Sequence, residues 1–411
     1  MRNIESEISL RLSAVLSIFA LTLWAGCQHR PVYPDIGSVY ISTNPQGAEV
    51  LMDGLMLRMI TPVKIDGISV GKHRITLRRF NYKSVEIDLE VKPAQTTRIY
   101  RKLEEVRLLR RDTLEIRSWD MDLLSDDGSL CLSNRDRDYV TLAWLSSDGQ
   151  ISVSRLINAG APQRLIAGSS RAGKIFVTRA RPDGEEEIAA IEILSGRVLR
   201  TQLLGGVKYY STLAFSPDGN LLVAADSLNK RLVLIDARLC SVVKVINLSG
   251  SPTDFCFDLQ DPGIVYVTQV LPNQLSRVNL ETGETERSLP AGDSPGAIFP
   301  DNRGLQIGFS NRSQLTYGLV NLSEWTVASS ANIIAGKFVV SACWSNHDDY
   351  VMWAMGYNLG ILYLPNWEQT SKIYNGGQYE IYSMVEILPA RDHRHLLLLN
   401  DHQLVSVEMD F

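Results

Sequence analysis

Short apolar runs separated by clusters of turn residues dominate the chain beyond residue 104. They are clearest from Leu213 to Leu248, where four runs cover residues 213–215, 221–225, 231–235 and 242–248. The segments between them are rich in Ser, Pro, Asp, Gly and Asn, which close hairpins. Four such strands in about 36 residues predict one up-and-down antiparallel sheet. Because both faces of this sheet are apolar, it needs further sheets to pack against.

The turn signal between a first and a second strand recurs at intervals of about 40 to 47 residues. Its seven copies are Asp127-Gly128, Arg171–Gly173, Asp218-Gly219, Asp261–Gly263, Asp301–Gly304, Asn346–Asp349 and Ala390–Arg394. This period is typical of propeller blades, and seven copies predict a seven-bladed ring. The last copy supplies only three strands. We expect a strand within residues 106–119 to complete it, because an open ring would expose strand edges.

The repeats resemble the YVTN family of bacterial β-propellers, most clearly between residues 205 and 300. The Trp-Asp dipeptide of WD repeats is missing. The resemblance implies a seven-bladed, YVTN/WD-like propeller over residues 104–411, and it names no ligand. The residues that carry it are Ser216-Pro217-Asp218-Gly219, Leu232–Asp236, Gly250-Ser251-Pro252, Tyr266-Val267-Thr268-Gln269 and Gly292-Asp293-Ser294-Pro295.

Alternating strands also fill residues 37–103, with turns at Asn44–Gly47, Asp53-Gly54 and Thr61-Pro62. This pattern predicts a compact all-β sandwich of about 65 residues. The segment resembles the PEGA domain, and the resemblance implies a non-catalytic role in the cell envelope. Ile60 and Asn81 stand where the family often has Gly. The matching positions are Ser42, Pro45, Gly47-Ala48, Val50, Asp53-Gly54, Thr61-Pro62, Gly71-Lys72-His73, Ile75, Leu77 and Tyr82.

The N-terminal segment contains a largely apolar run, Leu12–Trp24, of about 13 residues. This run is short for a membrane span and suits a signal peptide. Ala25-Gly26-Cys27 resembles the lipobox of bacterial lipoproteins, although Trp24 stands where Leu is usual. The resemblance implies removal of residues 1–26, a lipid on Cys27 and a tether over residues 27–36. An ordinary secretory signal or an uncleaved anchor remains the alternative.

The position after Cys27 bears on localisation. Gln28 stands there rather than Asp, which favours the outer membrane of a bacterial cell envelope. The sequence leaves open whether the protein faces the periplasm or the cell surface.

Charge is unevenly placed along a chain of ordinary globular composition, with 45% hydrophobic residues and a net charge of −5. Residues 37–103 carry a net charge of +5 and residues 104–411 carry −10. An acidic large domain repels phosphate, which argues against nucleic-acid binding. A basic cluster at the junction either contacts an anionic envelope polymer or lipid headgroup, or is a solvated edge. Its members are Arg98, Arg101, Lys102, Arg107, Arg110 and Arg111.

The sequence shows no catalytic constellation and no metal-binding pattern. It contains no Gly-rich phosphate loop and no Ser nucleophile elbow. His393 and His402 fall in turns at opposite ends of the predicted last blade, so they do not form a ligand set. The four cysteines beyond Cys27 fall in separate blades, too far apart for disulfides. We therefore predict no metal, no cofactor and no enzymatic activity.

Candidate binding residues lie in two kinds of loop, those leading into each blade and those joining its second and third strands. Tyr and Arg dominate binding hot spots, and packing between blades is the alternative for the tyrosines. The candidates are Lys208, Tyr209, Tyr210, Gln378, Tyr379, Arg135, Arg137, Lys230 and Arg312.

Together these patterns predict a non-catalytic envelope lipoprotein that acts as a protein-binding scaffold. The propeller face would dock an envelope protein, and the PEGA domain would be a spacer or envelope contact. Two alternatives remain open at this point. One is a lactonase- or lyase-like propeller enzyme acting on a small molecule. The other is cell-wall or polysaccharide binding through the basic PEGA domain.

Overall fold

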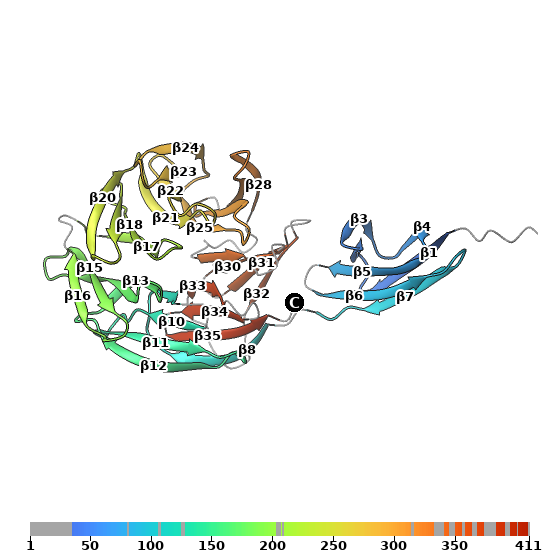
Figure 1. Cartoon of the computed structure of the whole chain (residues 1–411), viewed down its shortest axis with the longest axis horizontal. Helices are drawn as coiled ribbons and strands as arrows, with labels where there is room; N and C mark the ends of the chain where they lie inside the picture. The colour runs from blue at the N-terminus through green and yellow to red at the C-terminus, as the bar shows by residue number, and fades with distance from the viewer. Residues whose placement is uncertain are drawn as a thin grey trace, which may run out of the picture. The chain divides into compact units, whose positions relative to one another are not determined.

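The computed structural model describes most of the chain from Asp35 to Met409. The described residues are 35–79, 82–105, 108–124, 128–202, 207, 209–313, 316–332, 341–344, 350–355, 358–363, 368–373, 384–390, 395–400 and 402–409. The chain divides into two compact units, one ending at Val106 and the other covering Arg107–Asp410. Both units are all-β, as the sequence predicts (Figure 1). Among these described residues there is no helix long and apolar enough to cross a membrane.

The first unit is a sandwich of a three-stranded sheet, β4-β1-β7, and a four-stranded sheet, β3-β2-β5-β6. Alternate residues of the strands point inward, and those of β1, such as Val39 and Ile41, are fully buried in the shared core. The strands are β1 (Ile36–Asn44), β2 (Glu49–Met52), β3 (Leu55–Ile60), β4 (Val63–Ser69), β5 (Gly71–Arg79), β6 (Tyr82–Val91) and β7 (Thr96–Lys102).

Two features of the sandwich differ from the sequence prediction. Strand β3 was not predicted, because most of its side chains are apolar yet exposed and show no alternation. The sandwich also extends beyond Leu103, where the sequence analysis placed its end. Lys83 N donates to Glu104 O at 2.8 Å, and Glu105 forms a bridge with Tyr82, so these residues still belong to the sandwich.

The pairing of β1 with β7 decides where the chain enters and leaves the sandwich. The two strands are parallel, with Ser38 opposite Thr96 and Asn44 opposite Lys102. The chain therefore enters at the Ile36 end and leaves at the Asn44 end. At the usual rise of a strand, the nine residues of β1 separate these ends by about 30 Å.

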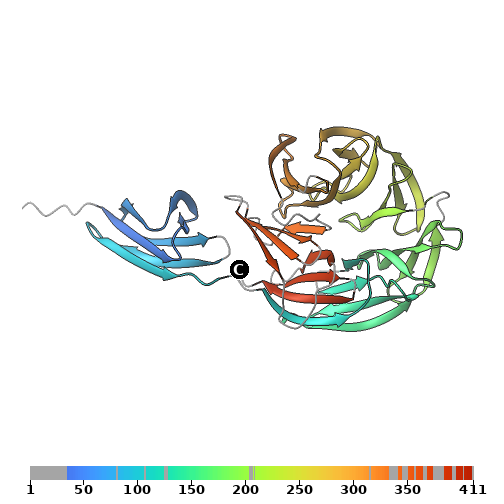
Figure 2. The ribbon, with the colours of Figure 1, turned by 180° about the vertical axis from the view of Figure 1, so that it is seen from behind.

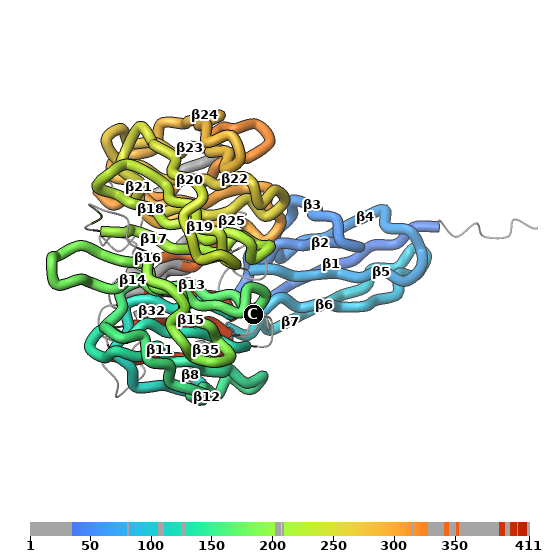
Figure 3. The backbone as a smooth tube through the Cα atoms, turned by 60° about the vertical axis from the view of Figure 1, so that its left-hand side comes forward, coloured from blue at the N-terminus to red at the C-terminus, as the bar shows by residue number. Residues whose placement is uncertain are grey.

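The second unit consists of seven four-stranded antiparallel sheets, numbered here in chain order. Within sheets 1 to 6, consecutive strands pair as hairpins, and the chain can be followed through sheets 3 and 4 in Figure 3. Sheet 1 contains β9 (Met121–Leu123), β10 (Ser129–Leu132), β11 (Tyr139–Leu145) and β12 (Ile151–Asn158). Sheet 2 contains β13 (Gln163–Ser169), β14 (Lys174–Ala180), β15 (Glu186–Glu192) and β16 (Val198–Gln202). Sheet 3 contains β17 (Tyr210–Phe215), β18 (Leu221–Asp226), β19 (Arg231–Asp236) and β20 (Ser241–Asn247).

The remaining four sheets follow the same plan. Sheet 4 contains β21 (Ser251–Phe257), β22 (Ile264–Val270), β23 (Gln274–Asn279) and β24 (Thr285–Pro290). Sheet 5 contains β25 (Pro295–Pro300), β26 (Gln306–Asn311), β27 (Thr316–Asn321) and β28 (Thr326–Asn332). Sheet 6 contains β29 (Ser341–Trp344), β30 (Tyr350–Met355), β31 (Asn358–Tyr363) and β32 (Glu368–Ile373). Sheet 7 joins β33 (Met384–Pro389), β34 (His395–Asn400) and β35 (Gln403–Met409) with β8 (Leu108–Glu115).

Strand β8 comes from the start of the second unit and is the fourth strand of sheet 7. It is antiparallel to β35, with Leu114 opposite Leu404. The first strands of successive sheets contact one another, from β9 with β13 through to β29 with β33. Met121 N then donates to the Glu386 carboxylate at 2.8 Å, which links sheet 1 to sheet 7. The sheets follow one another around a common centre (Figures 1 and 2).

Sheets 1 to 4 each bury both faces against their neighbours, because successive side chains of a strand point in opposite directions. In β18, Leu222 and Ala224 pack toward sheet 2, whereas Val223 and Ala225 pack toward sheet 4. A further core joins sheets 1 and 7 and includes Leu130 and Leu399. A single sheet would leave one of these apolar faces in water. The hydrophobic effect therefore requires the repeated array.

Candidate functional site

The first strands of the seven sheets surround a cavity of about 340 Å³. Each sheet contributes lining residues, so the cavity lies at the common centre of the second unit. One representative per sheet, in chain order, is Met121, Ile166, Leu213, Thr253, Ile298, Ser341 and Ile387.

Carboxylates stand at this centre because each first strand is the inner edge of its sheet. The backbone N–H groups on the free edge of this strand, which faces the centre, have no partner strand. Buried N–H groups need hydrogen-bond acceptors. For the first strands of sheets 1, 2 and 5, a carboxylate of the preceding sheet supplies the acceptor. The pairs are Asp120 Oδ2 with Ile166 N at 2.7 Å, Asp254 Oδ2 with Ile298 N at 3.1 Å, and Glu386 Oε2 with Met121 N at 2.8 Å.

Burial shifts the protonation of these carboxyl groups. It raises the pKa of Asp254 to about 6, although a hydrogen bond from Thr212 opposes the shift. It also raises the pKa of Asp120 to about 7. Burial raises the pKa of Glu386 as well, reinforced by the charge of Asp120, to which it is hydrogen-bonded. Two carboxyl groups can hydrogen-bond only when they share a proton, so Asp120 and Glu386 hold one between them near neutral pH.

The sequence analysis missed this centre. Asp120, Asp254 and Glu386 lie in three different repeats, and only the fold brings them to one cavity. The available signal was an acidic residue at the start or within a first strand of several copies. The described residues hold no group of three or more His, Cys, Asp or Glu side chains placed to bind a metal. The four described cysteines are free, and three of them are buried.

A second set of features lies on the face formed by the loops leading into first strands and the loops joining second and third strands. We call this the leading face. Here two exposed aromatic rings each lie beneath a guanidinium group. The Cζ atom of Arg135 is 4.1 Å from the ring centroid of Trp119, and that of Arg164 is 4.1 Å from the centroid of Tyr209. Trp119 is 37% exposed and Tyr209 is 47% exposed.

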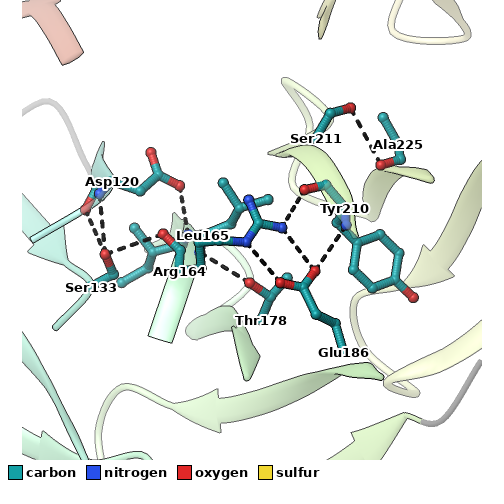
Figure 4. A network of polar contacts seen from close by, with 10 residues as sticks. Asp120, Ser133, Arg164, Leu165, Thr178, Glu186, Tyr210, Ser211 and Ala225 are labelled. Carbon is teal, nitrogen blue, oxygen red and sulfur yellow. Dashed lines mark hydrogen bonds and ion pairs between the residues drawn. The ribbon is translucent and has the colours of Figure 1, made fainter. Parts of the chain in front are cut away.

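Arg164 is held in place by a network that spans sheets 2 and 3 (Figure 4). Its Nε and Nη2 atoms donate to the two carboxylate oxygens of Glu186 at 2.7 and 2.8 Å. Nη2 also donates to Tyr210 O, while Tyr210 N donates to Glu186 Oε2 at 2.8 Å. Ser133 of sheet 1 extends the network through its hydrogen bond to Arg164 O. The cation above Tyr209 is therefore held by groups from sheets 2 and 3.

A larger cavity, of about 640 Å³, opens beside the Trp119 stack. It lies between sheet 1 and β8, and Arg135 N donates to Arg117 O, one of its lining residues, at 2.9 Å. Arg117 pairs with Asp136 at 2.6 Å. Its lining residues include Ile116, Arg117, Arg137, Tyr139, Leu156 and His402.

The predicted binding residues fall into three groups: exposed, buried, and outside the described residues. Arg137, Lys230 and Arg312 are exposed, and Arg312 also lines the central cavity. Tyr210 corrects the prediction, because it is fully buried in the core between sheets 2 and 3. It follows Tyr209 directly, and neighbouring strand residues face opposite ways. Lys208, Gln378 and Tyr379 lie outside the described residues, as does Cys27.

The predicted basic cluster is divided between the two units. Arg98, Arg101 and Lys102 are exposed on β7, where Arg98 Cζ lies 5.9 Å from the Tyr40 ring centroid. Arg110 and Arg111 belong to β8, and Arg111 forms an ion pair with Glu408 of the same sheet. The charge of Arg111 is therefore paired within sheet 7. Arg107 lies outside the described residues.

Comparison with known proteins identifies the first unit. Residues 36–107 match the family model of the PEGA domain, which confirms the prediction for this segment. The match covers the sandwich and does not reach the seven sheets. No curated protein matches the chain.

Proposed function

We propose that this chain is a cell-envelope lipoprotein that docks a partner protein on the leading face of its seven-sheet unit. Cys27 would carry the lipid in an outer membrane, and the tether of residues 27–36 would lead to the PEGA domain. The PEGA domain would act as a spacer. The role is binding rather than catalysis.

The observation that carries the proposal is the pair of exposed aromatic–arginine stacks. Trp, Tyr and Arg are the residue types enriched in binding hot spots. Arg164 is ordered before any partner arrives, by Glu186 and Tyr210. Side chains that are already ordered lose little conformational entropy on binding. The cavity beside Trp119 offers a recess for a partner side chain.

The PEGA domain supports the spacer role through its strand order. Because β1 and β7 are parallel, the chain leaves the sandwich about 30 Å from the point where it enters. A membrane tether on one side would thus hold the seven-sheet unit away from the anchoring surface. Tethering also raises the effective concentration of the docking face for a membrane partner.

Crosslinking of intact envelopes, followed by purification of the full chain and mass spectrometry, tests this proposal. We expect one stoichiometric partner whose crosslinks fall on leading-face loops, such as Asn134–Asp138 and Ser227–Lys230. Crosslinks confined to the opposite face, or a chain recovered alone, would contradict it.

The central cavity favours a second candidate, an enzyme acting on a small molecule. A shared-proton pair and a further carboxyl of raised pKa resemble acid–base machinery. Their hydrogen bonds to neighbouring sheets equally well explain them as part of the ring. Turnover of a lactone panel that is lost in Asp254→Asn, with unchanged folding, would favour the enzyme.

A further inference from the structure

The end of the PEGA domain at which the chain enters carries exposed apolar side chains. Leu55 is 72% exposed, and Ile36, Met56 and Val70 are also exposed. We call these four residues the tether-end patch. Met59, Ile60, Tyr40 and Tyr100 are exposed elsewhere on the sandwich. The core is filled by other apolar residues, so the four residues of the patch are not needed for packing within it.

Backbone and side-chain contacts bring the members of the tether-end patch to the same end. Val70 N donates to Asp35 O at 2.9 Å, which places Val70 beside Ile36. The ring of His73 then links the β4–β5 turn to the β2–β3 hairpin. Its Nε2 atom is 2.9 Å from Ser69 O, and its Nδ1 atom is 2.7 Å from Asp53 Oδ2, two residues before Leu55.

The shape of β3 disfavours a second copy of the chain as the cover for this patch. An exposed apolar edge strand can pair with another strand. Here Arg58 has a positive φ of 54°, and the register with β2 shifts between Glu49 and Leu51. Bulges of this kind bend an edge and interrupt the row of hydrogen-bonding groups that strand addition needs.

The position of the tether favours a bilayer instead. Asp35 is eight residues from Cys27, so a fully extended tether spans at most about 28 Å. The end of the domain that carries the patch is the end from which this tether leaves. Exposed Lys72 and Lys92 lie there too, since Gly71 pairs with Val91, and they suit anionic headgroups.

We propose that the tether-end patch rests on the lipid bilayer, with Leu55 and its neighbours at the boundary between headgroups and acyl chains. The inference rests on the proposed anchoring at Cys27. A patch this small would bind weakly from solution, but the anchor makes its contact intramolecular.

Radical footprinting of the full chain tests the contact without depending on lipidation in the cell. Cys27 would be coupled to a maleimide lipid in vesicles of phosphatidylethanolamine and phosphatidylglycerol. The oxidation rates of Leu55 and Met56 would be compared with that of exposed Tyr100 and with those in a Cys27→Ala chain mixed with the same vesicles. We expect protection of Leu55 and Met56 in the coupled chain only, with Tyr100 unchanged.

Two variants sharpen the result. Leu55→Asp, at an exposed position, should abolish protection of Met56, whereas Leu194→Asp, at a position 88% exposed in the second unit, should leave it intact. Unchanged oxidation of Met56 in the coupled chain would overturn the proposal. So would protection that persists without vesicles and grows with protein concentration, because that outcome identifies a second copy. Failure of cellular lipidation at Cys27 would appear separately, in membrane fractionation.

Discussion

The guanidinium of Arg164 lies over the ring of Tyr209, with Cζ 4.1 Å from the ring centroid. The cation is supplied by sheet 2 and the ring by the loop leading into sheet 3. Glu186 accepts hydrogen bonds from both the Arg164 guanidinium and Tyr210 N, so it joins the two sheets that supply the stack. The exposed aromatic surface and the stability of the sheet junction therefore depend on the same arginine.

Loss of the Glu186 carboxylate should loosen this junction. Glu186→Ala leaves the half-buried Arg164 without its bidentate partner, so we expect the free energy of unfolding to fall by about 2 kcal/mol. Urea unfolding of the second unit measures the change. Arg181→Ala is the matched control, because its ion pairs with Asp183 and Glu185 lie in a loop and should contribute less than about 1 kcal/mol. Equal effects of the two variants would show that the network adds no stability.

Strand β8, the first strand of the second unit, should stabilise that unit by pairing with its last strand, β35. Leu114 packs against the core shared by sheets 1 and 7, so Leu114→Ala should cost about 2 kcal/mol. Thermal unfolding of the full chain checks this, with the PEGA transition as an internal reference. An unchanged transition of the second unit would mean that β8 is dispensable.

The carboxyl groups of the central cavity should make the second unit less stable as pH rises from about 4 to about 7. The pKa of Asp254 rises from 3.8 to about 6 in the folded chain, and that of Asp120 rises to about 7. Each carboxyl group therefore keeps its proton to a higher pH in the folded chain than in the unfolded chain. Its contribution to the free energy of unfolding is complete below the pKa of the unfolded chain and is lost as pH rises through the pKa of the folded chain.

Glu386→Gln tests the origin of that pH dependence. Glutamine can still accept from Met121 N and donate to the Asp120 carboxylate, so the hydrogen bonds survive without a shared proton. The melting temperature of the variant should fall less between pH 4 and pH 7 than that of the wild type. Parallel profiles would place the pH dependence elsewhere.

Close packing of glycine against aromatic rings should make sheet 5 intolerant of added bulk. A Cβ at Gly308 would lie 2.3 Å from a ring carbon of Phe299. Gly308→Ala should therefore cost about 1 to 3 kcal/mol. Gly263→Ala is the control, because its added Cβ meets only the flexible carboxylate of Asp261 at 3.1 Å. Urea midpoints that fall equally would contradict the packing argument.

The sequence predicted the sheets well wherever turn residues bracket alternating or apolar runs. In sheet 3 the predicted runs 221–225 and 231–235 differ from β18 and β19 by one residue at the end. Strand β3 was not predicted because its apolar side chains are exposed on both sides of the strand, and this pattern shows no alternation of buried and exposed positions.

Site residues were harder to predict, because their roles depend on contacts distant in sequence. Tyr209 and Tyr210 look equivalent in the chain, yet one is exposed and the other is fully buried. Arg164 gave no signal at all, since its partners Glu186 and Tyr210 lie 22 and 46 residues away. Charge and residue type alone could not separate a docking arginine from a structural one.

Recovery of a crosslinked partner by the Trp119→Ala/Tyr209→Ala double variant tests the central claim most directly. Both rings are exposed, so the variant should fold, and Leu194→Ala on the opposite face serves as the matched control. Loss of two aromatic hot spots should lower recovery by about tenfold or more. Recovery equal to that of the wild type and the control would show that the leading face does not dock the partner.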